Sequence, residues 1–493
     1  MRLRINSETS NAEWRSLTAT SHGGTGALQL RLLLAACLAL LVGCGGGEVS
    51  SEAASEMPLA REERQLVIEL PTEVEEVRAT TADFSPTFGS VLDGGGTGVP
   101  GTSSASAVLP AKPKLAITLF SDDTSVTRQA AVARYQFAIV SMTAWKSASE
   151  LQSFVTGVKQ RNPNIKLAQY VMLQELQDYA STDPNYPKTQ AVNASNWWHR
   201  NASGTRTQWT TGYAAYNVNI TDWALPDATG KRWHQVKAKF DNDKFFANMK
   251  GLDYVYLDGF DVPLSDGDWK RIGTNQSRTD PEIVSAYRKG NVNYVNSVRA
   301  LNPGLKFIGN SASIESPEYK GQIEGVNREC LMGKSWSLEG RGWEIMMASY
   351  RTALANVKAP SKDVVFGACN TKTTIDPQLY RYGLASALME DGYYSFAENT
   401  YKQLPWYDES DAPLGTAAEA PPTAPTSSGI WMRRYTNGLV LVNPSKTTVA
   451  TINVGAGYKY VKGTIDTVVN TGLPVANNTV TLQPRSGLVL IKQ

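Results

Sequence analysis

Histidine and cysteine are scarce in this sequence, which has three His and four Cys among 493 residues. Only His199 and His234 follow Cys44, so no metal site built from several histidines is expected there. Cys330 and Cys369 are the only cysteines after Cys44, and they show no CxxC or Cys/His spacing. They form a disulfide in an oxidising compartment or remain two buried thiols, and the sequence leaves both open. We expect no metal and no cofactor.

Motifs of several common enzyme classes are missing as well. There is no GxSxG segment of the kind that presents a nucleophilic serine. No Walker loop and no GxGxxG segment follows a predicted strand, so the sequence does not indicate a nucleotide-binding fold.

The sequence also lacks an excess of charge of either sign. Its 48 Lys and Arg residues nearly balance its 46 Asp and Glu residues. The segment before Cys44 carries four Arg and two Glu, so the balance is closer still without it. Binding to nucleic acid through neutralisation of phosphates is therefore disfavoured. Hydrophobic residues make up 42% and charged residues 19%, which are the proportions of a globular protein.

The apolar run Leu32–Val42 is too short to span a bilayer, which takes about 20 residues. With a basic residue before it, the run fits the hydrophobic region of an export signal. The letters LVGC that end at Cys44 resemble the bacterial lipobox, which predicts a signal over 1–44 and a lipid on Cys44. A plain secretory signal and an N-terminal anchor are the alternatives. Because Gly45 replaces the Asp of an inner-membrane retention signal, we expect the outer membrane or the cell surface.

The rest of the chain divides by composition. Residues 45–112 are rich in Gly, Ser, Ala, Thr and Pro and predict a flexible tether. Residues 404–428 are rich in Pro, Ala and Thr and predict a linker. Residues 429–493 alternate apolar and polar residues between Asn-Gly and Gly-Ala-Gly turns, which predicts a small antiparallel β-sandwich.

Short apolar runs alternate with longer amphipathic segments over 113–403, a pattern typical of βα units around a parallel sheet. Eight such units predict an α/β fold, the (β/α)8 or TIM barrel. The interval 173–251 is too long for one loop and one helix, and we expect it to stand at the C-terminal mouth. The predicted strands are Leu115–Phe120, Phe137–Ser141, Lys166–Met172, Tyr254–Asp258, Lys306–Asn310, Ile323–Glu329, Val364–Ala368 and Tyr393–Glu398.

The segment Gly251–Pro263 (GLDYVYLDGFDVP) carries the sharpest chemical signal. An apolar strand ends in Asp258, which is followed by Gly259 and by a second carboxylate, Asp261. The C-terminal ends of barrel strands open onto the active-site face, so Asp258 is expected to point into the mouth. The alternative is that one of these Asp residues caps the next helix.

A second carboxylate, Glu329, lies near the end of the sixth predicted strand, in IEGVNRECLM. Cleavage of a glycosidic bond needs one carboxyl group to protonate the leaving oxygen and another to attack the sugar or activate water. Asp258 and Glu329 are therefore the predicted catalytic pair; a salt bridge is the alternative for Glu329. Side chains at or just after other strand ends are the predicted substrate contacts: Asp261, Trp145, Tyr170, Asn310 and Glu398.

Tryptophan is concentrated in one part of the chain, since nine of the twelve Trp residues lie between Trp145 and Trp343. Flat apolar rings stack on sugar faces, which favours a carbohydrate partner. The alternative for any single Trp is that it packs a loop onto the barrel.

The motif YLDGFD, the segment IEGVNRECLM and the closing RRYTNGLVLVNPS resemble the glycosyl-hydrolase-like family fifteen of bacteria. The resemblance covers 114–493 and implies an amylase-like (β/α)8 barrel with a C-terminal β-domain. It also implies that Asp258 is similar to the strand-four nucleophile of retaining α-glycosidases such as the α-galactosidase clan. Glu329 is then similar to the strand-six acid/base. That clan generally has Asp on strand six, so the Glu here leaves the two roles open to reversal.

Together these observations predict a glycoside hydrolase on a lipid tether that cleaves O-glycosidic bonds of an extracellular or envelope polysaccharide, with retention of configuration. Its partners are then a carbohydrate and a membrane, and not nucleic acid. The alternative is a lipoprotein that binds polysaccharide on the same scaffold without cleaving it.

Overall fold

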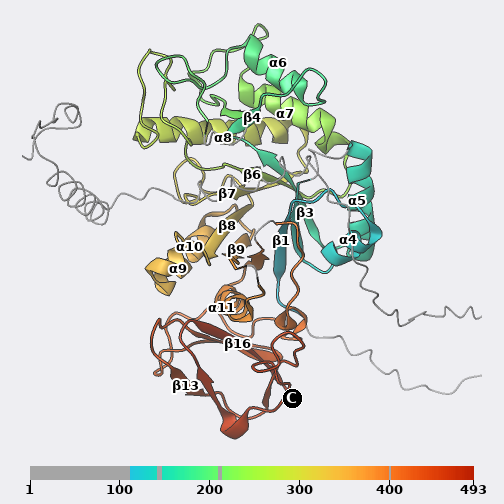
Figure 1. Cartoon of the computed structure of the whole chain (residues 1–493), viewed down its shortest axis with the longest axis vertical. Coiled ribbons are helices and arrows are strands. Elements are labelled where there is room, and N and C mark those ends of the chain that lie inside the picture. Colours follow the sequence, from blue (N-terminus) through green and yellow to red (C-terminus); the bar gives the residue numbers. More distant parts are fainter. Residues whose placement is uncertain (1–110, 142–146, 209–213, 373, 399–400) are drawn as a thin grey trace, which may run out of the picture. The chain divides into compact units, whose positions relative to one another are not determined.

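The computed structural model of the chain describes residues 111–141, 147–208, 214–372, 374–398 and 401–493 (Figure 1). Cys44, the predicted signal, residues 45–110 of the predicted tether, and Trp145 lie outside the described residues. Among the described residues, no helix has the length and apolar character that crossing a membrane requires.

Eight parallel strands close into a barrel in the order β1-β10-β9-β8-β7-β6-β3-β2. The predicted (β/α)8 barrel is confirmed, and each predicted strand overlaps one of these eight. The strands are β1 (Leu115–Leu119), β2 (Phe137–Val140), β3 (Lys166–Met172), β6 (Tyr254–Asp258), β7 (Lys306–Asn310), β8 (Gly325–Met332), β9 (Asp363–Cys369) and β10 (Tyr393–Ala397).

Between β7 and β8 the chain forms turns, and helices follow most of the other barrel strands. They are α4 (Val126–Val132), α5 (Ala148–Arg161), α6 (Tyr186–Ala194), α7 (Trp233–Lys244), α8 (Pro281–Leu301), α9 (Leu338–Arg341), α10 (Trp343–Asn356) and α11 (Pro377–Leu388). Their starts follow local rules. Helix α8 begins with Pro281 after Asp280, whose carboxylate accepts the Glu282 N–H at 2.8 Å, and α11 begins in the same way with Pro377 after Asp376.

The strands are buried on both faces, as helices around a barrel require. Side chains alternate along each strand, so every second residue points into the barrel. On β6, Tyr254 and Tyr256 belong to the inner cluster, whereas Val255 and Leu257 belong to the outer one. Asp258 has the same parity as the two tyrosines, which places it at the inner side of the mouth.

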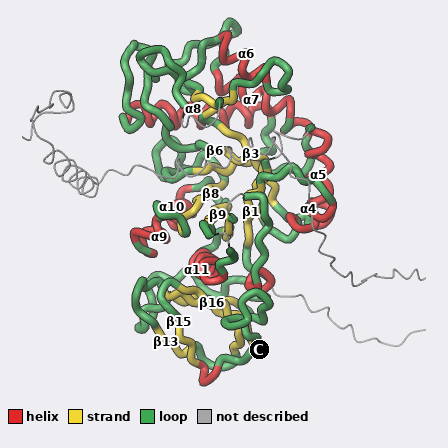
Figure 2. Tube along the Cα trace, in the orientation of Figure 1, coloured by secondary structure: helices red, strands yellow, loops and turns green. Residues whose placement is uncertain are grey.

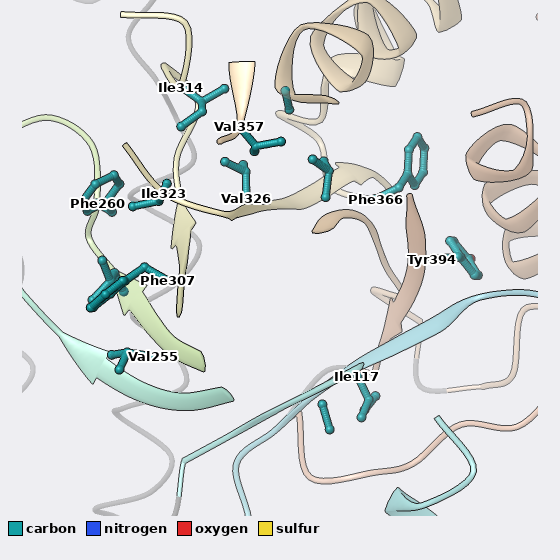
Figure 3. Close-up of a cluster of buried hydrophobic side chains, with 14 of the residues drawn as sticks. Ile117, Val255, Phe260, Phe307, Ile314, Ile323, Val326, Val357, Phe366 and Tyr394 are labelled. Carbon is teal, nitrogen blue, oxygen red and sulfur yellow. The ribbon is translucent and has the colours of Figure 1, made fainter. Parts of the chain in front are cut away.

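The outer cluster lies between the strands and the helices (Figure 3). It includes Val255 and Phe307 on neighbouring strands, and Phe260 just beyond β6. Burial of apolar surface contributes about 25 cal/mol per Å², so this layer stabilises the fold.

The long interval between β3 and β6 forms substructure of its own. It holds a two-stranded sheet of β4 (Glu175–Gln177) and β5 (Ala215–Asn217), the helices α6 and α7, and the 3-10 turn η1 (Phe246–Asn248). Helix α7 packs between α6 and α8, and the three helices lie together in Figure 1. Figure 2 shows how much irregular chain surrounds them.

The C-terminal part consists of two antiparallel sheets with a shared apolar core. One sheet has the order β11-β12-β16-β14 and the other pairs β13 with β15. These strands are β11 (Trp431–Tyr435), β12 (Gly438–Asn443), β13 (Ala450–Asn453), β14 (Tyr458–Tyr460), β15 (Thr479–Leu482) and β16 (Ser486–Lys492), with a 3-10 turn η3 at Ala476–Asn478. The antiparallel character agrees with the sequence, and the predicted sandwich stays a prediction.

The first part of the predicted linker, 404–428, is packed against the barrel. It forms the 3-10 turn η2 (Asp408–Asp411), and the Tyr407 ring stacks on Tyr380 of α11 with the ring centroids 4.1 Å apart. Leu414 is fully buried. The apolar residues among the prolines explain this packing, which the overall composition of the segment conceals.

Candidate active site

Asp258 lies at the C-terminal end of β6 and is 5% exposed. Its carboxylate accepts hydrogen bonds from the Tyr170 hydroxyl, from the Gly259 N–H at 2.9 Å and from the Asn310 amide at 3.3 Å. Gly259 has φ +68°, a left-handed conformation in which the chain turns directly after Asp258. Three donors on one carboxylate fix its orientation.

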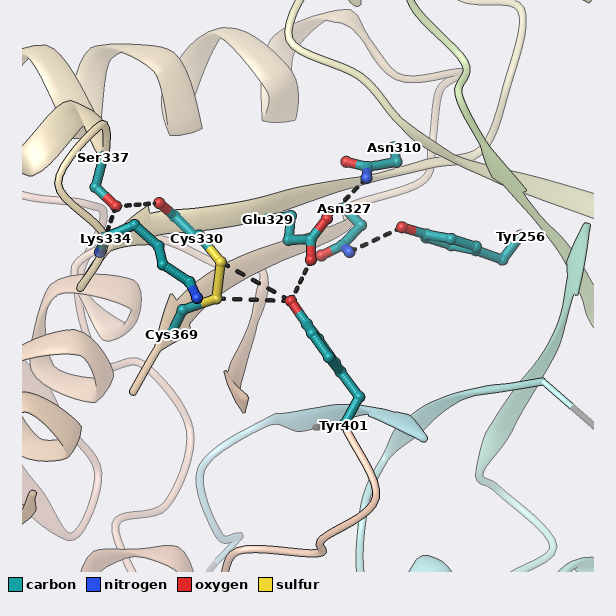
Figure 4. The surroundings of a disulfide bond; sticks show 9 residues. All are labelled: Tyr256, Asn310, Asn327, Glu329, Cys330, Lys334, Ser337, Cys369 and Tyr401. Carbon is teal, nitrogen blue, oxygen red and sulfur yellow. Dashed lines mark hydrogen bonds between the residues drawn. A yellow bond between two sulfur atoms is a disulfide. The ribbon is translucent and has the colours of Figure 1, made fainter. Parts of the chain in front are cut away.

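Glu329 lies on β8 and is partly exposed. Its Oε2 accepts a hydrogen bond from the Asn310 amide at 2.9 Å, and its Oε1 accepts one from the Tyr401 hydroxyl. Figure 4 shows this carboxylate between Asn310 and Tyr401.

Asn310 ends β7, the strand between β6 and β8, and its single amide nitrogen contacts both carboxylates. The structure therefore brings four predicted residues together, namely Asp258, Glu329, Asn310 and Tyr170. Side-chain alternation accounts for Tyr170, Asp258 and Asn310, which have the parity of the inner cluster at or near the C-terminal ends of their strands. Glu329 lies on β8 three residues before that strand ends.

Two parts of the site were not predicted from the sequence. Tyr401 follows β10 with a φ of +50° and contacts Glu329. Cys330 and Cys369 form a disulfide next to it, which resolves the alternative that the sequence left open. The one sequence feature that could have indicated Tyr401 is its place just after the eighth strand. Residues with a hydroxyl group are common in such loops, so this feature does not single it out.

Asp261 lies apart from this carboxylate pair. Its Oδ2 accepts the Ala312 N–H at 2.9 Å, and its Oδ1 lies 3.5 Å from the Arg288 guanidinium on α8. These contacts tie the loop after β6 to the loop after β7. Asp261 thus holds two loops of the mouth together. Its role as a substrate contact stays a prediction.

Glu398 follows β10 and accepts hydrogen bonds from the Asn370 amide at 3.0 Å and from the Tyr407 hydroxyl at 3.3 Å. It lines a cavity of about 390 Å³ together with Arg128, Lys402 and Trp406. Neither Asp258 nor Glu329 lines that cavity. Contact of Glu398 with substrate stays a prediction.

The described tryptophans of the loops are mostly packed. Trp197, Trp198, Trp233 and Trp269 are each at most 4% exposed. The packing alternative therefore holds for these four rings, which anchor the long interval and the loop after β6 to the helices.

His199 lies in the same packed region and is 1% exposed. Its ring stacks on Trp269 at 3.6 Å between centroids, and its Nδ1 lies 2.6 Å from the Thr207 hydroxyl. Burial lowers the pKa of His199 to about 3, against an opposing effect of Asp268. The histidine is therefore neutral when the protein is folded, and it is a core residue of the loops.

This burial predicts a pH dependence of stability. Because the folded pKa lies below the unfolded value of 6.5, the stabilisation is present above pH 6.5 and is lost as the pH falls toward 3. Between pH 7 and pH 5 we expect His199 to cost about 2 kcal/mol of unfolding free energy. His199→Phe, which keeps a ring on Trp269, removes this dependence.

Denaturant unfolding of both proteins at pH 7 and pH 5 measures the effect. Each protein is compared with itself, so the lost Thr207 contact cancels. An equal fall in stability for wild type and variant contradicts the prediction.

Among the described residues, no group of three or more His, Cys, Asp or Glu side chains has the arrangement of a metal site.

A closed parallel barrel with two carboxylates at its mouth has the pair of groups that cleavage of a glycosidic bond requires. The chain belongs to hypothetical glycosyl hydrolase family 15, whose family model matches residues 159–439. The predicted resemblance is confirmed, and the protein is a glycoside hydrolase. The matched range contains Asp258, Asn310 and Glu329.

Comparison with solved structures returned glycoside hydrolases. The hydrolase domain of PelA from Pseudomonas aeruginosa is 13% identical, with a TM-score of 0.36, and the match covers 59% of this chain and 97% of that domain. An alpha-amylase from Lactobacillus plantarum is 12% identical, with a TM-score of 0.45 and coverages of 77% and 98%. The GH36 alpha-galactosidase AgaA A355E from Geobacillus stearothermophilus is 10% identical, with a TM-score of 0.40 and coverages of 78% and 56%. A comparison with curated proteins returned no match.

Proposed function

We propose that the protein cleaves O-glycosidic bonds of an extracellular or envelope polysaccharide with retention of configuration. The observation that carries this proposal is the bridge through Asn310. Its amide nitrogen lies 3.3 Å from Asp258 Oδ1 and 2.9 Å from Glu329 Oε2. These two oxygens are thus separated by at most the sum of the two distances, about 6.2 Å. The contact brings the two carboxyl groups within reach of one glycosidic bond, and the anomer of the first product distinguishes retention from inversion.

In the first step, Glu329 donates its proton to the leaving oxygen while Asp258 attacks the anomeric carbon. The bond between that carbon and the leaving oxygen breaks, and an ester to Asp258 forms. In the second step, water attacks the same carbon, Glu329 takes the proton of the water, and Asp258 leaves as a carboxylate. Two displacements restore the original configuration.

The surroundings of the carboxylates support this division of labour. Asp258 accepts three hydrogen bonds and is nearly buried, so its carboxylate is held in one orientation. Glu329 is the more exposed of the two, and water reaches it more easily for the second step.

The proposal is tested with the full-length protein and a panel of bacterial polysaccharides. Reducing-end release by wild type, absent in Asp258→Asn, supports hydrolysis. Proton NMR of the first product then gives the anomer: retention supports the proposal, whereas inversion contradicts the double displacement. Binding without release by wild type on every polysaccharide contradicts the catalytic role of this carboxylate pair.

The location of the protein is a further part of this proposal: export and a lipid on Cys44 place it at the outer membrane or cell surface. The apolar run and the LVGC letters support this location. The Cys330–Cys369 disulfide agrees with it, because disulfides persist in oxidising compartments.

Cys44→Ser tests the anchor. We expect wild type in the detergent phase of a phase-separation assay and the variant in the aqueous phase, because one diacylated cysteine supplies the membrane affinity. Cys37→Ser is the matched control and is expected to behave like wild type. Equal partitioning of wild type and Cys44→Ser argues against lipidation.

A further inference from the structure

Glu329 sits where the ladder between β8 and β9 is interrupted. Arg328 pairs with Phe366, and the next pair is Met332 with Ala368. Four steps along β8 thus oppose two steps along β9, and residues 329–331 fall in the interruption. Such bulges are common next to active sites, where they redirect a side chain. Strand pairing alone therefore does not fix the position of Glu329.

The backbone of the bulge is unusual at Cys330, which has a φ of +47°. This left-handed region is unfavourable for residues other than Gly, Asn and Asp, so surrounding contacts must hold the residue there. On the facing strand, a Cβ at Gly367 would lie 2.9 Å from the Arg328 carbonyl oxygen and 3.1 Å from Glu329 Cα. The bulge is thus pressed against the backbone of β9.

The disulfide fastens this bulge. It joins Cys330, in the bulge, to Cys369, at the end of β9, with 5.0 Å between the Cα atoms. Both cysteines are at most 3% exposed. The Tyr401 hydroxyl lies 3.8 Å and 3.7 Å from the two sulfur atoms and donates a hydrogen bond to Glu329 (Figure 4).

We propose that the disulfide Cys330–Cys369 and Tyr401 are positioning elements for Glu329, so that full acid/base function requires the oxidised protein. The inference rests on the proposed role of Glu329. With the disulfide open, Cys330 is free to leave its left-handed conformation, and the backbone of the adjacent Glu329 moves with it. The Tyr401 hydroxyl then loses its contact with the paired sulfur atoms, and it no longer holds Glu329 Oε1 toward the mouth.

The redox step is an ordinary thiol exchange. A dithiol reductant gives two electrons and two protons to the sulfur–sulfur bond, which becomes two thiols, and the reductant becomes a cyclic disulfide. The chain would thus be a poor hydrolase in a reducing compartment and a full one in an oxidising compartment. Activity then depends on the compartment in which the cysteines pair.

The test uses the double variant Cys330→Ala/Cys369→Ala and the single variant Tyr401→Phe, each in the full chain. Each is assayed on one aryl glycoside and one alkyl glycoside. A dinitrophenyl glycoside needs no proton on its leaving group, whereas an alkyl glycoside does. We expect kcat for the alkyl glycoside to fall at least about 10-fold in the double variant, as expected when a general acid is misplaced. The rate of glycosyl transfer from the dinitrophenyl glycoside to the enzyme is expected to change less than about 2-fold.

Tyr401→Phe keeps the disulfide and is expected to show the same selectivity with a smaller loss. Tyr294→Phe, which removes a buried hydroxyl that donates to Asp241 at 2.8 Å between α8 and α7, is the matched control. Equal losses on both glycosides, or no loss on either, overturn the proposal.

A second readout does not need activity. Amide hydrogen exchange over residues 326–332 is expected to speed up in the double Cys variant, while exchange over 254–258 stays as in wild type. If wild type cleaves neither glycoside, the proposed function fails and exchange alone decides whether the disulfide clamps the bulge. Unchanged exchange over 326–332 overturns the clamp.

Discussion

Replacing Asp258 with glycine is expected to lower kcat for a dinitrophenyl glycoside by roughly 10⁴-fold, on the scale seen when a residue of a covalent mechanism is removed. The reason is that the carboxylate that we propose attacks the anomeric carbon, and that three donors hold in place, is then gone. The fall is measured by release of dinitrophenolate under saturating substrate. Circular dichroism checks that the barrel remains folded.

Azide makes this result specific. The glycine leaves a space in which a small anion replaces the carboxylate, so azide restores dinitrophenolate release. The product is expected to be a glycosyl azide with the opposite anomeric configuration to the substrate, because only one displacement occurs. Asp261→Gly is the matched control: its carboxylate faces Arg288 and Ala312, so azide is expected to have no effect on it. Rescue of Asp261→Gly by azide, without rescue of Asp258→Gly, would mean that Asp261 is the attacking residue.

Replacing Glu329 with glutamine is the second large effect. We expect kcat for an alkyl glycoside or the natural polysaccharide to fall about 10²- to 10⁴-fold, which is the usual contribution of a general acid. Formation of the glycosyl-enzyme from a dinitrophenyl glycoside is expected to be little changed, since that leaving group departs without a proton. Pre-steady-state release of dinitrophenolate separates this step from the slower hydrolysis.

Glu329→Ala with azide tests the reverse assignment that the Glu on the sixth strand leaves open. If Glu329 is the acid/base, azide attacks the ester on Asp258 and gives a glycosyl azide with the configuration of the substrate. A product of opposite configuration means that Glu329 is the attacking group and that the two roles are exchanged.

The barrel and its carboxylates were predictable because they follow from short-range rules. Eight apolar runs separated by amphipathic segments determine the parallel barrel, and side-chain alternation then places Asp258 and Asn310 on the inner side. The end of a strand is itself a sequence feature, namely the point where an apolar run meets Gly or a polar residue. This is why four of the predicted residues converge.

The remainder of the site depends on long-range contacts that leave no local pattern. Tyr401 meets Glu329 across 72 positions of sequence, and Cys330 meets Cys369 across 39. The bulge in β8 could not be predicted from the sequence either, because a strand with two extra residues looks like a longer apolar run. Trp197 and Trp269 were ambiguous for a different reason: an aromatic ring suits both a sugar and a loop core, and burial decides between them.

The linker shows the limit of composition as a guide. Pro, Ala and Thr dominate 404–428, yet Tyr407 and Leu414 within it are buried. A few apolar residues suffice to dock a segment when a complementary surface such as α11 is nearby, and the sequence of the segment itself does not contain that surface.

Trapping of the covalent intermediate tests the central claim most directly. The full-length protein is incubated with the 2-deoxy-2-fluoro glycosyl fluoride of the sugar identified by the polysaccharide panel, and the mass of the intact protein and of its peptides is measured. We expect a gain of one fluorosugar per chain on the peptide that contains Asp258, and no gain for Asp258→Asn. An adduct on another carboxylate, or inversion of the product with no adduct, contradicts it.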